Sequence, residues 1–224
     1  IRRQYAAGKP WFTWVNTTHM HLRTHPKPES IGRAGRWQST YHDTMLDHDD
    51  LVGKLVELLD ELGIADNTLV MYSTDNGAEV MSWPDGGTTP FRGEKDTNFE
   101  GGWRVPCAIR WPGVIQPGTV SNDVHSHQDM LPTLAAAAGD PDVVEQLKTG
   151  YKSGKKTFKV HIDGYNLLPR WKGQAKENPR RGFIYWSDDG DLMALRVDDW
   201  KATFVEQRGH GLGVWREPLV TLRA

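Results

Sequence analysis

The clearest pattern of apolar and polar positions along the chain is helical. Between residues 41 and 62, apolar residues recur at spacings of three and four with charged residues between them, and Gly63 follows. This is the periodicity of an amphipathic helix, and glycine is common just beyond a helix end. The pattern predicts a helix over 41–62. A shorter helix is predicted over 129–138, where Asp129 suits the cap and Pro132 suits the first turn.

Short apolar runs predict strands before and after the long helix. Residues 11–16 are aromatic and β-branched, and the runs 68–74 and 107–111 are bounded by turn residues. Such runs are typical of strands. The order strand, long helix, strand predicts a crossover connection between parallel strands, and therefore an α/β core.

The last part of the chain has a different order of predicted elements. Three strand-like runs follow one another without a helix, separated by aspartate-rich turns: 182–186, 192–196 and 200–205. This order predicts hairpins and a small antiparallel sheet. We therefore expect a boundary near residue 170, with the start of a small subdomain over 171–224. The charged stretch 140–160 is expected to be a solvated surface loop.

Composition narrows the classes of function. The net charge of −2 gives no strong field for binding nucleic acid or an anionic membrane. No stretch approaches the ~20 apolar residues that a membrane span needs. The single cysteine, Cys107, excludes an intrachain disulfide and a cysteine-built zinc site. Cys107 lies inside a strand pattern, where a lone cysteine acts as a small apolar residue.

Candidate metal ligands follow the strand over 68–74. Ligands of open α/β sheets bind beyond the carboxyl ends of strands, where Asp75 and Asn76 stand. A carboxylate beside a carboxamide offers hard oxygen ligands, which suit Ca²⁺ or Mg²⁺. Asp-Asn-Gly also favours turns, so a plain turn remains an alternative for these residues alone.

Histidines are the second kind of candidate site residue. His19 and His21 are two residues apart after the predicted first strand, and on an extended chain they point to opposite faces. Only one of them is expected to face a site. The other clusters are interpreted as solvated charge or loop residues: Asp43, Asp47, Asp49, Asp50, His25, His125 and His127.

Two linked motifs carry a family resemblance. Ser73-Thr74-Asp75-Asn76-Gly77 is followed by a loop that runs from Phe91-Arg92-Gly93-Glu94-Lys95 to Gly101-Gly102-Trp103-Arg104-Val105-Pro106. Together they resemble sulfatases of the arylsulfatase type, in the alkaline phosphatase superfamily. The step Asp163-Gly164-Tyr165-Asn166-Leu167-Leu168-Pro169 is similar to one near the close of the main domain of sulfatases. The resemblance therefore implies that 1–170 is the second half of the catalytic domain.

The resemblance implies a fold and a site. The fold would be an alkaline-phosphatase-like mixed sheet flanked by helices, with a small antiparallel C-terminal subdomain. The reaction would be hydrolysis of a small-molecule or glycan sulfate ester by a formylglycine nucleophile. Asp75 and Asn76 would hold Ca²⁺ together with ligands from an N-terminal half, and Lys95 would contact the ester. His19, the first histidine of Thr-His-Met-His, would protonate the leaving oxygen. His21 has no such match and is interpreted as a loop residue.

The resemblance also implies what the sequence lacks. Cys107 has no proline two places on, so it does not match the Cys-x-Pro-x-Arg stretch that yields formylglycine. We therefore expect a C-terminal fragment that is inactive alone, from a protein that the family places in the periplasm or outside the cell. A phosphodiesterase or phosphonate monoester hydrolase, or a non-catalytic binder of sulfated glycans, remains an alternative. Trp83 and Trp103 are candidates for shaping the pocket.

Overall fold

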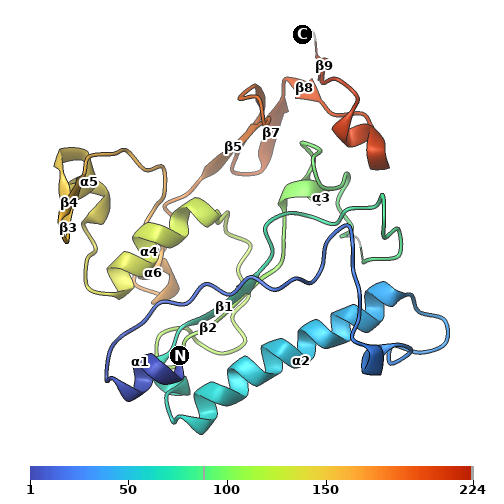
Figure 1. The fold of residues 1–224 in the computed structure, drawn as a ribbon. Coiled ribbons are helices and arrows are strands. Elements are labelled where there is room, and N and C mark those ends of the chain that lie inside the picture. Colours follow the sequence, from blue (N-terminus) through green and yellow to red (C-terminus); the bar gives the residue numbers. More distant parts are fainter. Residues whose placement is uncertain (88, 223–224) are drawn as a thin grey trace.

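The computed structural model describes residues 1–87 and 89–222. Besides one long helix, α2, which lies along one side of the molecule, the chain forms short helices and two- or three-stranded antiparallel sheets (Figure 1). None of the described helices is both long and apolar enough to cross a membrane. In chain order the elements are α1 (Arg2–Ala6), η1 (Pro28–Ser30), α2 (Thr40–Glu61), η2 (Ala65–Asn67), β1 (Val70–Ser73), α3 (Glu100–Trp103), β2 (Cys107–Arg110), η3 (His127–Asp129), α4 (Met130–Ala137), α5 (Val143–Thr149), β3 (Tyr151–Ser153), β4 (Lys156–Phe158), α6 (Leu168–Trp171), β5 (Gly182–Trp186), β6 (Leu192–Val197), β7 (Trp200–Thr203), β8 (Val205–Glu206), η4 (Gly211–Trp215) and β9 (Val220–Thr221).

The long predicted helix is confirmed as α2, but two of its aspartates are not solvated as expected. Asp43 accepts hydrogen bonds from the backbone N–H groups of Gly32 and Ala34, at 2.7 and 2.8 Å. Asp47 accepts from the backbone of Lys27 and from the Ser30 hydroxyl. Both carboxylates are buried. Because a charge leaves water only when such partners replace it, these aspartates fix the loop before α2 onto the helix.

The predicted first strand is wrong. Residues 11–16 are in neither helix nor strand, and Phe12 and Trp14 are 71% and 78% exposed. The strand β1 instead pairs with β2, antiparallel, with Ser73 opposite Cys107. A strand needs a neighbour for its N–H and C=O groups, and no strand within the described residues is hydrogen-bonded to this apolar run. The parallel crossover that the pattern predicted is therefore not formed by these segments.

The C-terminal sheet is confirmed as β5, β6 and β7 in antiparallel order, and it is fastened to α3. Glu100, at the start of α3, accepts hydrogen bonds from the Tyr185 hydroxyl at 2.7 Å and from Arg196 at 2.8 Å. Lys201 lies 3.3 Å from the same carboxylate. In Figure 1 the sheet lies at the opposite end of the molecule from α2, with α3 between them.

The stretch 140–160 is not a plain loop. It contains α5 and the hairpin β3–β4, in which Tyr151 pairs with Phe158. Val143 and Leu147 are buried, so α5 packs through a short apolar face. The many charged residues of the segment made this face hard to recognise in the sequence.

A buried ion pair ties α4 to the segment before β5. Asp129 has no exposed surface, and its carboxylate accepts two hydrogen bonds from Arg180, at 2.7 and 2.8 Å. It also accepts from the backbone of Ser126 and Tyr165. The sequence predicted Asp129 as the cap of the 129–138 helix, which is confirmed as α4, but the carboxylate makes no capping hydrogen bond to that helix. It joins three separate segments instead.

Candidate functional site

The Asp75–Asn76 turn follows β1 directly. Asp75 is exposed, and the Thr74 hydroxyl donates to its carboxylate at 3.4 Å. The Asn76 side chain donates through its amide nitrogen to the carbonyl of Gly77 at 2.8 Å. Because the amide nitrogen is taken by this bond, the amide oxygen of Asn76 is the atom left to bind a cation. The turn therefore keeps two oxygen-bearing side chains at the end of β1.

Glycines let α3 pack against this turn. The backbone N–H of Gly77 donates to the carbonyl of Gly102 at 2.8 Å. A Cβ on Gly77 would overlap the carbonyl oxygen of Gly101, and one on Gly101 would overlap that of Gly93. Three chain segments therefore approach at a distance that only glycine allows. The glycine pattern of the sequence is the reason that the Lys95 loop lies beside the end of β1.

The loop that carries Lys95 is held from both sides. The Lys95 N–H donates to the carbonyl of Ala78 at 2.9 Å. Its neighbour Glu94 is buried, and its carboxylate accepts from the backbone N–H of Val80 at 2.9 Å and of Gly211 at 3.0 Å. A buried carboxylate with two such partners fixes the backbone around it. The Lys95 side chain therefore projects from a rigid loop.

The side chain of Lys95 lies against His21. Its ammonium nitrogen is 3.5 Å from Nε2 of His21, and it lies 5.5 Å from the ring centre of Trp215. The backbone of His21 is held in turn, since its carbonyl accepts from the Thr24 hydroxyl at 2.9 Å and from the Trp83 indole at 3.2 Å. A cation and an imidazole thus face the same place from two fixed segments.

His19 lies in a different environment. Its ring is 6.0 Å from that of His48 on α2, and within the part of the chain that the structure describes its buried Nδ1 has no hydrogen-bond partner. His48 contacts the hydroxyls of Thr17 at 3.2 Å and Tyr72 at 3.0 Å. Burial, and then the nearby His19, lower the pKa of His48. His19 and His21 thus have different neighbours, and His21, interpreted as a loop residue, is the one that reaches Lys95.

The residues present fit part of a calcium site. Ca²⁺ takes six to eight oxygen ligands, and Asp75 and Asn76 offer a carboxylate and an amide oxygen of the right kind. In residues 1–87 and 89–222, no three His, Cys, Asp or Glu side chains are grouped closely enough to hold a metal. The donor set of this chain is therefore compatible with Ca²⁺ but incomplete by itself.

Two further residues from the sequence motifs, Cys107 and Trp103, lie in other surroundings. Cys107 lies on β2 and is exposed, and partial desolvation by its neighbours raises the pKa of its thiol, which disfavours the reactive thiolate. Trp103 was expected to shape the pocket, but its ring packs against Phe183 and Tyr185, with centroids 5.4 and 5.1 Å apart. It therefore belongs to the contact between α3 and the C-terminal sheet.

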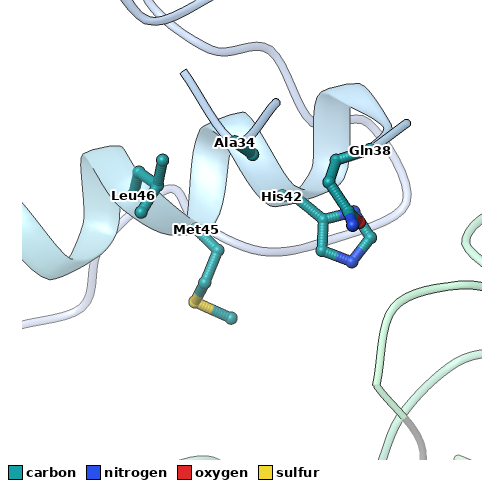
Figure 2. Close-up of a pocket in the computed structure, with 5 residues that line it drawn as sticks. All are labelled: Ala34, Gln38, His42, Met45 and Leu46. Carbon is teal, nitrogen blue, oxygen red and sulfur yellow. The ribbon is translucent and has the colours of Figure 1, made fainter. Parts of the chain in front are cut away.

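A separate pocket lies at the start of α2 (Figure 2). None of the candidate site residues Asp75, Asn76, Lys95, His19 and His21 lines it. Its lining consists of Ala34, Gln38, His42, Met45 and Leu46.

Comparison with known proteins identifies the family. The chain is 33% identical over 205 residues to N-acetylgalactosamine-6-sulfatase of Mus musculus and 32% identical over 204 residues to arylsulfatase A of Homo sapiens. These alignments cover 90% and 89% of this chain, which spans about 36% of the length of each relative.

The fold is shared with solved sulfatases. The PsFucS1 sulfatase from Pseudoalteromonas sp. matches with a TM-score of 0.85 and 27% identity, over 100% of this chain and 42% of that one. This likeness confirms the predicted α/β fold class. The family model Sulfatase matches residues 2–140, which is more than half of the sequence. The chain therefore belongs to the sulfatase family.

Proposed function

We propose that this chain is part of an enzyme that hydrolyses sulfate esters of small molecules or glycans. The observation that carries the proposal is the approach of Lys95 to His21, two residues that come from separate loops. A fixed ammonium group can bind an anionic ester oxygen, and a neighbouring imidazole can donate a proton to a departing alcohol oxygen. Family membership and the names of the relatives support the choice of a sulfate ester.

Lys95 would act through its charge. Since its loop is held by Glu94 and by the glycine contacts, the ammonium group needs little reorganisation to meet developing negative charge. Removing one such preorganised donor typically costs about 10²–10³ in turnover. His21 would act as the general acid, because it is the histidine in contact with Lys95. The family resemblance assigns that role to His19, so the two assignments must be separated by experiment.

Asp75 and Asn76 would hold Ca²⁺ with further ligands from the rest of the protein. Bound there, the ion would neutralise charge on the sulfate oxygens. The formylglycine nucleophile implied by the resemblance has no counterpart in this sequence, and we propose that the chain is inactive without the segment that supplies it.

The test uses the full-length protein and two substrates, the activated 4-nitrophenyl sulfate and an alkyl sulfate with a poor leaving group. Lys95→Ala should lower kcat about 10²-fold or more on both. His21→Ala should lower it by about 10²-fold or more on the alkyl ester and much less on the aryl ester, as expected for a general acid. His25→Ala, an exposed histidine of the same loop, is the matched control.

His19→Ala decides between the two histidines. If it produces the leaving-group dependence and His21→Ala does not, the acid is His19. Hydrolysis of a phosphodiester or phosphonate ester in preference to both sulfates would overturn the sulfatase assignment. Binding of sulfated glycans with no turnover would identify a non-catalytic binder.

A further inference from the structure

Trp215 is the aromatic side chain beside the cation of the candidate site. Its ring centre lies 5.5 Å from the Lys95 ammonium nitrogen, and the residue is 52% exposed. Tryptophan has a large apolar face, which is usually removed from water. Its exposure next to Lys95 therefore leaves an open aromatic surface at the place where an ester oxygen would bind.

The turn that presents Trp215 is held rigidly. Gln207 is buried, and its amide nitrogen donates to the carbonyls of Val214 at 3.0 Å and Glu217 at 2.8 Å, on either side of Trp215. At the other end of η4, the N–H of Gly211 donates to Glu94, the neighbour of Lys95. The same carboxylate thus positions both the lysine loop and the tryptophan turn. An exposed ring on a fixed backbone is preorganised to receive a ligand.

The distances suit a ring that carries the ester. An ammonium-to-oxygen contact is about 3 Å long, and the ring atom that bears the ester lies one covalent bond beyond the oxygen. A ligand ring bound through Lys95 would therefore reach the indole face that lies beside the ammonium group. Aromatic side chains favour flat apolar faces, such as those of aryl groups, and the C–H face of a sugar is similarly apolar.

We propose that Trp215 is a specificity-determining residue that stacks on the ring bearing the sulfate ester. The inference rests on the proposed function and adds a substrate class to it: sulfate esters on a ring, aryl or sugar, are preferred to esters on an open alkyl chain. The sequence alone gives no signal for this role, because residue 215 is far from the motifs that mark the site.

The test compares 4-nitrophenyl sulfate, a hexose 3-sulfate and hexyl sulfate as substrates of the full-length protein. Trp215→Ala should raise KM about tenfold on substrates with rings, with a smaller change in kcat, and should leave hexyl sulfate within about twofold. Trp215→Phe should keep most of the affinity. Trp200→Ala removes another exposed tryptophan, which belongs to the C-terminal sheet, and is the matched control.

The arms of the test separate the outcomes. A rise in KM for only the aryl ester, or for only the sugar ester, identifies which kind of ring stacks on Trp215. Each of these results supports the proposal. An equal rise for hexyl sulfate would mean that Trp215 acts by holding Lys95, and no change on any substrate would mean that it makes no contact; each overturns the proposal. If the wild-type protein turns over no sulfate ester, the proposed function fails. Calorimetry with two non-hydrolysable ligands, phenylmethanesulfonate and hexanesulfonate, then still decides the inference. A stacking role predicts that Trp215→Ala weakens binding of the first and not of the second, and an equal loss on both would overturn it.

Discussion

The two sides of the candidate site differ in how far the chain encloses them: the Lys95 loop is packed, and the Asp75 turn is exposed. The Lys95 side is enclosed by contacts within the chain: Glu94 is buried with two backbone partners, and Asn98, also buried, donates to the carbonyl of Val205 at 2.6 Å. On the other side Asp75 is exposed, and its one described hydrogen bond is the 3.4 Å contact with Thr74. The fold of this chain therefore fixes the cation, whereas the carboxylate stays in water, where it is available to a metal.

The largest effect is expected at Gly77, the residue between the two sides. Gly77→Ala places a Cβ on backbone atoms of Gly101, and backbone cannot move aside as a flexible side chain can. The free energy of unfolding should fall by about 3 kcal/mol, the upper end of the usual range for overpacking. Urea denaturation measures this change.

A matched control is Gly53→Ala on α2. An added Cβ at Gly53 has no neighbouring atom within 4 Å. Alanine is favoured over glycine inside a helix, so this variant should gain about 0.5–1 kcal/mol. Equal stability of the two variants would mean that the contact between the turn and α3 is loose in the protein.

A second, pH-dependent effect is expected at Glu100, which fastens α3 to the C-terminal sheet. Burial alone would raise its pKa, but the hydrogen bond from Tyr185 and the charges of Lys201 and Arg196 outweigh burial and hold the pKa below its ordinary value of 4.5. A carboxylate with a lowered pKa stabilises the fold above the ordinary value, and this stability is lost as the pH falls through the lowered value.

The measurement is urea unfolding of the wild type and Glu100→Gln at pH 7 and at several values below 4.5. At pH 7 the variant should be less stable by about 1.5–3 kcal/mol, the usual contribution of hydrogen bonds to charged groups. The difference should shrink as the pH falls. A difference that stays constant with pH would contradict the assigned charge of Glu100.

The smallest effect on stability is expected at Asp75. Since the side chain is exposed, Asp75→Ala should change the free energy of unfolding by no more than about 0.5 kcal/mol in the absence of calcium. In the full-length protein, however, the rise in Tm on adding Ca²⁺ should be lost, because binding to the native state stabilises it. Asp49→Ala, another exposed aspartate, is the control. An unchanged calcium response in Asp75→Ala would remove Asp75 from the ligand set.

The pattern of apolar and polar residues correctly predicted the elements whose hydrogen bonds form within one segment or between neighbouring segments. The periodicity of 41–62 gives α2 because a helix satisfies its own backbone, and the alternation of strands and turns after residue 181 gives hairpins between neighbours in sequence. Residues 11–16 have equally strong strand composition, yet form no described strand, because a strand needs a partner that composition does not specify. Likewise Asp43 and Asp47 could not be distinguished from their exposed neighbours without the loop that covers them.

The sequence by itself determined the family and the chemical parts of the candidate site: the Asp75–Asn76 turn, the glycines that follow it and the loop of Lys95. These residues are close together in sequence, and their spacing is specific. Only the tertiary structure decided which histidine meets Lys95 and that Trp215 lies beside it. His21 and Lys95 are 74 residues apart, and that contact depends on how separate loops pack on a shared scaffold, which no local periodicity records.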